Sequence, residues 1–389
     1  MKEGNSKKGA APLSALQKNL DALLQNKAEA PGLLGAIFAT AVKQEASDIH
    51  LEPRAGFVLV RFRLDGVLRD AARLPSAFLE PLVNLIKIQA ELRIDEHASS
   101  QDGAIRYEKD GVKADFRVSI LPTIAGEKVA VRILLGRGRR LTLDELGLSP
   151  EQKKLAGEKA REPYGMILVT GPTGSGKTTT LYGLVQTIHG PDINITTIED
   201  PVEYAVEGLN QVQVNRQSNL TFDKGLRAIV RQDPNVILVG EIRDLETAKI
   251  AVNAALTGHR LLSTFHANDA AAAIPRLITM GIEPYLLASS LELIVAQRLV
   301  RSLCPSCKVP DNLTRAALID EWPRLEKFLP TKLPTFYAAQ GCNECLGSGY
   351  QGRVGMFEFL EIDPAIQDLI LARPSAKQVR ELARASGQR

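Results

Sequence analysis

The chain is poor in cysteine, in aromatic residues and in long apolar runs. Its 389 residues include four cysteines and one tryptophan, and aromatic residues make up 5%. A chain of this length needs no disulfide framework, so the cysteines indicate metal binding in a reducing compartment. No run of 18 uncharged apolar residues occurs, and no apolar stretch follows the basic N-terminus. We therefore expect neither a transmembrane helix nor a secretory signal.

The chain also lacks an excess of one charge. Lys and Arg total 48 and Asp and Glu total 45, which gives a net charge of +3. This small balance provides no electrostatic case for a nucleic-acid coat or a polybasic membrane protein. Apolar residues make up 44% and charged residues 24%, as in ordinary globular proteins. The length predicts two or three domains.

Two kinds of periodicity divide the chain. The first part combines helical stretches with alternating strands and Asp-Gly turns, which predicts an α+β domain. Its expected elements are helices at 13–24, 32–44 and 81–94, hairpins at 57–69 and 104–120, and a strand at 128–135. Short apolar strands then alternate with helices, which predicts a parallel sheet covered by helices. These strands are expected at residues 166–170, 194–198, 236–240 and 260–264, and two closing helices at 362–385.

One segment carries a specific phosphate-binding signal. Residues 171–178, GPTGSGKT, match G-x-x-x-x-G-K-[ST] between an apolar strand and a helical stretch. Its glycines let backbone N–H groups face phosphate oxygens, and the helix N-terminus adds a favourable dipole. Lys177 is expected to reach the β- and γ-phosphates and Thr178 to bind Mg²⁺. The predicted nucleotide contacts are Gly171, Pro172, Thr173, Gly174, Ser175, Gly176, Lys177, Thr178 and Thr179.

Further polar residues follow the predicted strands, at the sheet edge where parallel α/β folds gather ligands. Glu241 ends a buried strand, where a carboxylate can polarise water or hold Mg²⁺ through water. His266 follows the next strand and suits contact with the γ-phosphate; a packed structural histidine is the alternative. His259 lies just past a predicted helix end, where a cation is favoured for helix reasons alone. A second acidic cluster, for which an ordinary acidic loop is the alternative, comprises Glu199, Asp200 and Glu203.

The four cysteines form two C-x-x-C pairs, Cys304 with Cys307 and Cys342 with Cys345. This spacing lets both sulfurs of a pair reach one metal, and two pairs complete a tetrahedral Zn²⁺ site. The 34 intervening residues exceed the common spacing, but a longer loop adds little closure entropy. Because four thiolates leave no open position, we expect structural zinc; redox pairs are the alternative.

Together these residues resemble the ATPases of type II secretion and type IV pilus assembly. The matching segments of the parallel-sheet part are TIEDPVEY (197–204), GLRAIVRQDPNVILVGEIRDLETA (225–248), AALTGH (254–259), LSTFHANDA (262–270) and ASSLELIVAQRLVRSLCPSC (288–307). SDIHLEP (47–53), VRFRLDG (60–66), QDG (101–103), FRVSILPTIAGEKVAVRIL (116–134) and GYQGRVGMFEFLEI (349–362) extend the resemblance to about residues 31–385.

The resemblance implies a PAS-like α+β domain joined to a RecA-like P-loop ATPase domain with a tetracysteine zinc lobe and C-terminal helices. The expected parts are a flexible tail with a short helix (1–30), the PAS-like domain (31–135), a linker (136–145), the ATPase core (146–303), the zinc lobe (304–348) and the closing segment (349–389). The family forms hexamers that hydrolyse ATP and drive an inner-membrane platform protein. This implies a cytoplasmic protein, peripheral at the inner face of the cell membrane.

The resemblance also assigns residues. The family's acidic box falls on Glu199, Asp200 and Glu203, of which the first two are expected to contact the nucleotide and Glu203 to act in catalysis. Its catalytic glutamate falls on Glu241 and its histidine box on His259 and His266. Arg117 and Arg132 match the N-terminal-domain arginines that approach the γ-phosphate. Guanidinium is permanently charged and grips phosphate bidentately, so it suits that role; solvated salt bridges on a strand face are the alternative. The family's further N-terminal domain, which docks on a membrane-anchored recruiting protein, is missing or reduced to about 30 residues here, so that partner is only a possible one.

Two other functions remain as alternatives. A RecA-like nucleic-acid translocase needs a basic or aromatic strand-binding channel, which the few aromatics and small net charge disfavour. A nucleotide-binding scaffold without turnover conflicts with the presence of Lys177, Thr178 and Glu241. The cysteine lobe further favours assembly or secretion, because the retraction ATPases that the family includes lack it. We therefore expect an ATPase with ATP, Mg²⁺ and Zn²⁺ and no nucleic-acid partner.

Overall fold

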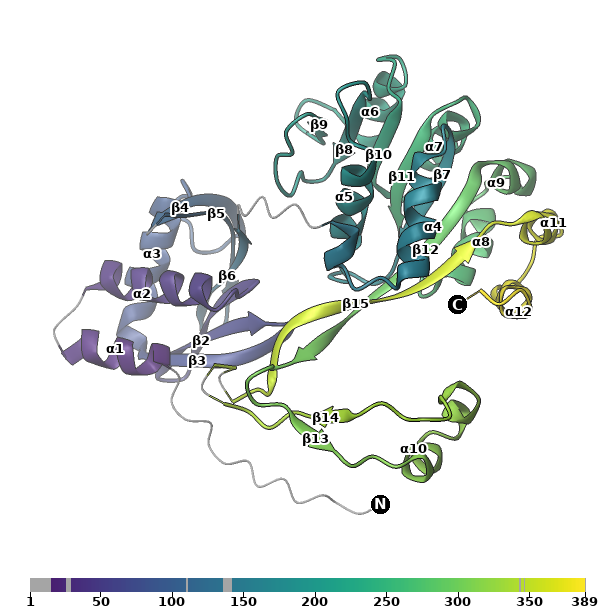
Figure 1. Ribbon diagram of the computed structural model, residues 1–389. Helices are drawn as coiled ribbons and strands as arrows, with labels where there is room; N and C mark the ends of the chain where they lie inside the picture. Colours follow the sequence, from purple (N-terminus) through teal and green to yellow (C-terminus); the bar gives the residue numbers. More distant parts are fainter. Residues whose placement is uncertain are drawn as a thin grey trace. The chain divides into compact units, whose positions relative to one another are not determined.

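The computed structural model describes residues 15–25, 29–109, 111–135, 142–342, 344–345 and 347–388. The chain divides into two compact units, which are considered separately (Figure 1). One unit comprises residues 1–137 and 301–353, and the other comprises residues 138–300 and 354–389. Most of the predicted linker, residues 136–141, lies outside the described residues. Among the described helices, none is long and apolar enough to cross a membrane.

The first unit is built on a six-stranded antiparallel sheet. Its strands, in the spatial order β3-β2-β1-β6-β5-β4, are β3 (Val67–Pro75), β2 (Phe57–Leu64), β1 (Asp48–Arg54), β6 (Gly126–Leu135), β5 (Val112–Thr123) and β4 (Gln101–Lys109). Both predicted hairpins are confirmed, because β2 pairs with β3 and β4 with β5. Asp65 and Gly66 have positive φ angles, as the tight turn between β2 and β3 requires.

Three helices cover one face of this sheet: α1 (Ala15–Gln25), α2 (Ala30–Lys43) and α3 (Leu79–Gln89) (Figure 1). The strands alternate, so Ile49 and Leu51 of β1 enter the core while Asp48 and Glu52 face away. The helix predicted at 81–94 ends five residues early. Glu91 adopts a left-handed conformation with φ of 56°, which a continuing helix does not allow.

The cysteine-bearing segment contributes small elements of its own to the first unit. They are β13 (Val309–Asp311), α10 (Arg315–Glu321), the 3₁₀ helix η3 (Pro323–Phe328) and β14 (Phe336–Ala338), with β13 and β14 forming a two-stranded sheet. Among its described residues, Leu318 and three cysteines are the buried hydrophobic ones. With so small a core, this segment gains little stability from apolar burial.

The second unit is built on a seven-stranded sheet. In spatial order its strands are β15 (Tyr350–Glu361), β12 (Leu291–Leu303), β7 (Gly165–Thr170), β11 (Arg260–Phe265), β10 (Val236–Ile242), β8 (Ile195–Glu199) and β9 (Asn210–Gln213). The six strands from β12 to β9 are mutually parallel. The four predicted strands form the centre of this sheet, which confirms the expected mixed α/β class.

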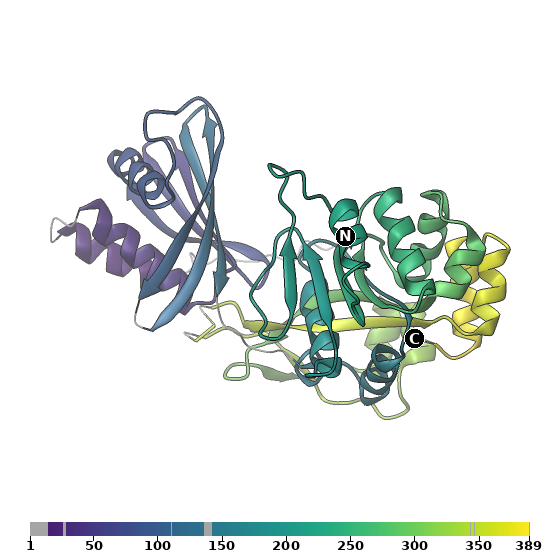
Figure 2. The ribbon, with the colours of Figure 1, turned by 90° about the horizontal axis from the view of Figure 1, so that it is seen from above.

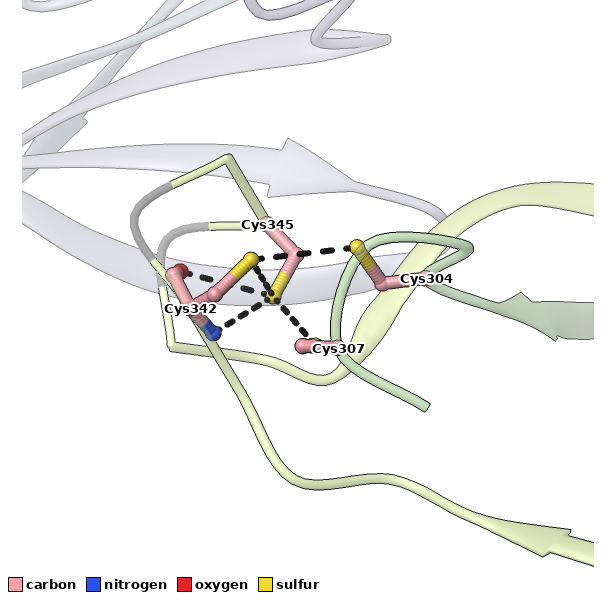
Figure 3. Close-up of side chains that lie close together, drawn as sticks. All are labelled: Cys304, Cys307, Cys342 and Cys345. Atoms are coloured by element: carbon pink, nitrogen blue, oxygen red, sulfur yellow. Dashed lines mark hydrogen bonds between the residues drawn. The ribbon is translucent and has the colours of Figure 1, made fainter. Parts of the chain in front are cut away.

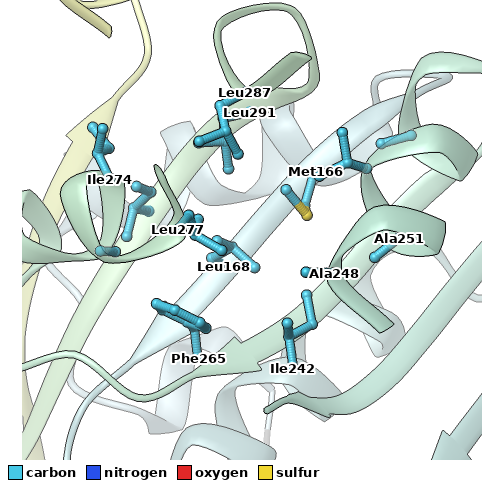
Figure 4. Close-up of a cluster of buried hydrophobic side chains, with 14 of the residues drawn as sticks. Met166, Leu168, Ile242, Ala248, Ala251, Phe265, Ile274, Leu277, Leu287 and Leu291 are labelled. Atoms are coloured by element: carbon cyan, nitrogen blue, oxygen red, sulfur yellow. The ribbon is translucent and has the colours of Figure 1, made fainter. Parts of the chain in front are cut away.

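Helices cover both faces of this sheet (Figures 1 and 2). One face packs on α4 (Pro150–Arg161), α5 (Lys177–Ile188) and the short η2 (Leu143–Glu145). The other packs on α6 (Phe222–Ile229), α7 (Leu245–Leu256), α8 (Ala270–Thr279), α9 (Pro284–Ser290), α11 (Pro364–Leu371) and α12 (Ala376–Ala385). Met166 and Leu168 of β7 enter the latter core, as Figure 4 shows, while Ile167 and Val169 enter the former. Burial on both faces explains why these strands read as continuous apolar runs.

Candidate nucleotide-binding site and cysteine cluster

The predicted phosphate loop connects the end of β7 to the start of α5. Gly171, Gly174 and Gly176 have φ angles of 148°, 76° and 84°, which L side chains rarely adopt. Gly176 is the N-cap of α5 and provides no side-chain cap, so the first-turn N–H groups of the helix are left for another acceptor. Ser175 Oγ is buried inside the loop without a hydrogen-bond partner among the described residues. These features fit a bound phosphate chain.

Lys177 supplies a cation at this loop. Its Nζ donates hydrogen bonds to the carbonyl oxygens of Gly171 and Pro172, each at 3.1 Å. Burial lowers the pKa of Lys177, and the charge of Glu241 partly opposes this effect. A poorly hydrated ammonium group interacts strongly with phosphate, because less water must be displaced.

Glu241 and His266 come together at the same edge of the sheet. His266 Nε2 lies 3.2 Å from Glu241 Oε2, and the guanidinium of Arg243 also bonds to the Glu241 carboxylate. The Glu241 side chain is 12% exposed. The structure therefore brings together three predicted residues, Lys177, Glu241 and His266, from three different segments of the chain.

The loop that carries His266 is fixed to the strand that precedes the phosphate loop. The hydroxyl of Thr170 donates to the carbonyl of Ala267 and accepts from its N–H, both at 2.9 Å. Thr170 is fully buried at the end of β7. This two-way bond ties the position of the histidine loop to that of the phosphate loop, and no sequence motif had singled out Thr170 or Arg243.

Glu199 lies inside the protein. Its carboxylate accepts hydrogen bonds from the Tyr182 hydroxyl at 2.5 Å, from Thr197 Oγ1 at 2.6 Å and from Gln211 Nε2 at 3.4 Å. Burial and this bond to Glu199 raise the pKa of Tyr182 far above its usual value. Because Tyr182 is on α5, the network links the helix after the phosphate loop to β8 and β9. Neither Tyr182 nor Gln211 carried a signal in the sequence.

The other predicted acidic residues are exposed. The pKa of Arg243 is raised mainly by its hydrogen bond with Glu241, and the negative charge of the exposed Asp200 adds to this rise. Glu203 contributes to the electrostatic environment of Tyr182. His259 Nδ1 lies 3.1 Å from the carbonyl oxygen of Ala254, so this residue caps α7, as its position past a helix end had suggested.

Arg117 and Arg132 belong to the first unit, where they are paired neighbours on β5 and β6. Arg132 Nε lies 3.3 Å from Asp48 Oδ1, and its side chain is 65% exposed. Exposed pairs of this kind contribute little stability, so the arginine is available to another anion at small cost. Its approach to a γ-phosphate stays a prediction.

The four cysteines form one cluster in the first unit (Figure 3). Their sulfur atoms all lie within 4.8 Å of one another, with separations of 3.9 Å between Cys304 and Cys342 and 3.7 Å between Cys307 and Cys345. Four sulfurs around a tetrahedral zinc ion, each about 2.3 Å from it, are about 3.8 Å apart. The donor set and its dimensions therefore fit Zn²⁺.

The surroundings of the sulfurs favour a bound cation. Burial raises the pKa of Cys307 to about 12, so this buried thiol ionises reluctantly by itself. Burial also acts against the Cys345 thiolate, but the N–H groups of Cys342 and Gly349, each 3.1 Å from its sulfur, outweigh it and lower the pKa to about 6. Metals bind thiolates. Cys345 is therefore readily ionised without a metal, and the positive charge of a bound ion would favour the thiolate form of the other cysteines.

Comparison with known proteins places these sites in a family. The family described as Type II/IV secretion system protein matches residues 24–389. The chain is 46% identical to type II secretion system protein E of Pseudomonas aeruginosa, over 97% of this chain and 76% of that protein. The chain belongs to this secretion-protein family. It is also 44% identical to the type IV pilus assembly ATPase PilB of Myxococcus xanthus, over 94% of this chain and 65% of PilB.

Solved structures agree with this membership. The pilus retraction motor PilT with bound ADP superimposes with a TM-score of 0.59 at 27% identity, over 90% of this chain and 88% of PilT. The ATPase DotB of Legionella pneumophila shares the fold, with a TM-score of 0.65 at 22% identity over 91% of this chain and 87% of DotB. The resemblance found in the sequence is thus confirmed, and with it the expected enzyme class, a secretion ATPase.

Proposed function

We propose that this secretion-family member hydrolyses ATP, with Mg²⁺, at the phosphate loop of its second unit. The observation that supports this most is the meeting of Lys177, Glu241 and His266 at the carboxyl ends of parallel strands. Ligands of open α/β sheets bind at this edge. The set predicted from the sequence was residues 171–179 with Glu199 and Asp200 for nucleotide binding and Glu203 for catalysis. Because Glu199 is bonded to Tyr182 and Thr197, we propose residues 171–179 as the nucleotide contacts, with Asp200 and Glu203 at their periphery.

The proposed roles follow from the contacts. Lys177 and the N–H groups at the start of α5 hold the β- and γ-phosphates, and Thr178 offers its hydroxyl to Mg²⁺, which neutralises phosphate charge when bound. Glu241 accepts a proton from the attacking water as the γ-phosphoryl group leaves ADP. Arg243 and His266 hold the Glu241 carboxylate in place. Arg117 and Arg132 add positive charge at the γ-phosphate.

We further propose that the cysteine cluster holds one structural Zn²⁺. All four ligands are thiolates, so no position is open for a substrate. The ion compensates for the small apolar core of this segment, in which zinc binding replaces hydrophobic burial as the source of stability.

At the level of the cell, we propose a homo-hexameric motor that acts on an inner-membrane platform protein from the cytoplasmic side. The names of the relatives support this, because proteins 44–46% identical to this chain act in type II secretion and type IV pilus assembly. A membrane-anchored recruiting protein is a further proposed partner. The relatives support both processes equally, so the proposal covers pilus assembly and secretion together.

The test is the steady-state rate of Mg-ATP hydrolysis by the purified chain. We expect turnover that single-stranded DNA does not change and that Lys177→Ala abolishes, because the phosphates lose their main cation. Lys249→Ala, which removes an exposed lysine of α7, is the matched control and should leave the rate unchanged. Stimulation by DNA would favour a nucleic-acid translocase, and binding without turnover would favour a scaffold.

A further inference from the structure

Gln297 of β12 lies directly behind the phosphate loop. Its Oε1 accepts a hydrogen bond from Thr180 Oγ1 at 2.6 Å. Both side chains are buried, with Gln297 3% and Thr180 2% exposed. Strand β12 is the parallel neighbour of β7, and Ala296 stands opposite Thr170 where the phosphate loop begins. A polar pair in this position is costly to bury unless both partners are satisfied.

The same residue touches both ends of the loop. A Cβ atom added to Gly171 would lie 2.4 Å from the carbonyl oxygen of Gln297, and one added to Gly176 would lie 2.9 Å from its Nε2. These separations are shorter than real Cβ contacts, so the backbone of the loop rests directly on Gln297. The two glycines therefore serve this close approach as well as the positive φ angles.

Thr180 connects this contact to the helix start. Its N–H donates to the carbonyl of Gly176 at 3.1 Å, so Thr180 completes the first turn of α5. The N–H groups of that turn are the ones that face a bound phosphate. Displacement of Thr180 would displace them, and small displacements of this kind reduce binding strongly.

We propose that Gln297 is a positioning residue of the ATP site. It holds the first and last glycines of the phosphate loop and, through Thr180, the first turn of α5 in the geometry that receives the triphosphate. This inference rests on the proposed nucleotide site, but it concerns binding alone. Its readout is the dissociation constant of a fluorescent ATP analogue, which does not depend on turnover.

The experiment compares Gln297→Met, Thr180→Val and the double variant. Each single change leaves one buried polar partner unsatisfied, so stability falls and the analogue should bind about tenfold more weakly, the effect of one lost buried hydrogen bond. In the double variant both partners are apolar, so stability should largely recover. The proposal predicts that affinity stays reduced, because the side-chain amide that lies against Gly176 is absent in the double variant, although the backbone carbonyl at Gly171 remains.

The outcomes separate positioning from a purely structural role. If affinity recovers together with stability in the double variant, or if Gln297→Met binds the analogue as tightly as the unmodified chain, the proposal is wrong. Thr180→Ser keeps the hydroxyl and should bind within about twofold of the unmodified chain, even where a more disruptive variant fails to fold. Gln186→Met, farther along α5, is the matched glutamine control. Absence of turnover with intact binding would instead contradict the proposed function.

Discussion

At the scale of single residues, the site depends on charged groups that are poorly hydrated and face partners of opposite charge. Lys177 is half-buried at the phosphate loop and feels the Glu241 carboxylate, which is itself held by Arg243 and His266. These side chains are already held in place by their neighbours before a nucleotide binds. Such preorganisation lets a site stabilise developing charge without reorganising.

Lys177 should therefore make ATP binding depend on pH. Burial lowers its pKa in the free protein, and a triphosphate, being anionic, favours the ammonium form and raises it again. Binding should then take up protons, and the uptake should grow as the pH rises from neutral toward the usual lysine pKa, because the free protein loses this proton first. Titration calorimetry in buffers of different ionisation enthalpy measures the uptake; binding with no uptake at any pH in that range would contradict the account.

The buried network around Glu199 leads to a second prediction at this scale. Tyr182→Phe removes one donor from a buried carboxylate, so the free energy of unfolding should fall by about 1–3 kcal/mol in urea titrations. Tyr164→Phe, at a tyrosine that is 54% exposed, should change it by less than about 0.5 kcal/mol. ATP affinity should change little. A large loss of affinity at unchanged stability would mean that Glu199 serves the nucleotide directly.

The residues that the sequence revealed and those that it did not differ in a physical way. Lys177 and His266 follow strand ends and Glu241 is the next-to-last residue of β10, and the parallel sheet brings such ends together. Thr170, at the end of β7, and Gln297, inside β12, act through neighbours that depend on strand order, which single-sequence patterns do not contain. Their partners, 97 and 117 residues away, were beyond local inference.

At the scale of elements, β12 lies in a segment whose secondary structure could not be predicted from its apolar residues. Residues 284–300 form the longest apolar stretch of the sequence, and nothing in it separates helix from buried strand. In the structure it divides after Ser290 into α9 and β12. Strand β15, which neighbours β12, was likewise not predicted as a strand. The two long outer strands at this side of the sheet could therefore be assigned only from the structure.

The cysteine-bearing segment is the element whose stability should depend on metal. We expect about one zinc per chain by elemental analysis, and loss of it in Cys345→Ser, since three thiolates cannot close the tetrahedron. Removal of zinc by a chelator should lower the melting temperature of this segment because little apolar burial replaces the ion. Ser302→Ala is a nearby control that should keep the zinc. Less than about half a zinc per chain with reduced thiols would contradict the site.

At the scale of the whole molecule, the chain combines an antiparallel α+β unit with a parallel α/β unit. The second unit contains the phosphate loop and Glu241, whereas the first contains the cysteine cluster and the arginines proposed to reach the γ-phosphate. Both lie within the region that matches the secretion-protein family.

The most direct test of the central claim is the effect of Glu241→Gln on ATP binding and hydrolysis measured together. Glutamine keeps the shape of the side chain but accepts no proton, so the account predicts nearly unchanged affinity and at least about 100-fold slower hydrolysis at saturating Mg-ATP. Glu246→Gln, which changes an exposed carboxylate of α7 paired with Arg227, is the control and should hydrolyse ATP normally. A Glu241→Gln variant that hydrolyses ATP at the unmodified rate would contradict the account, because another group would then prepare the attacking water.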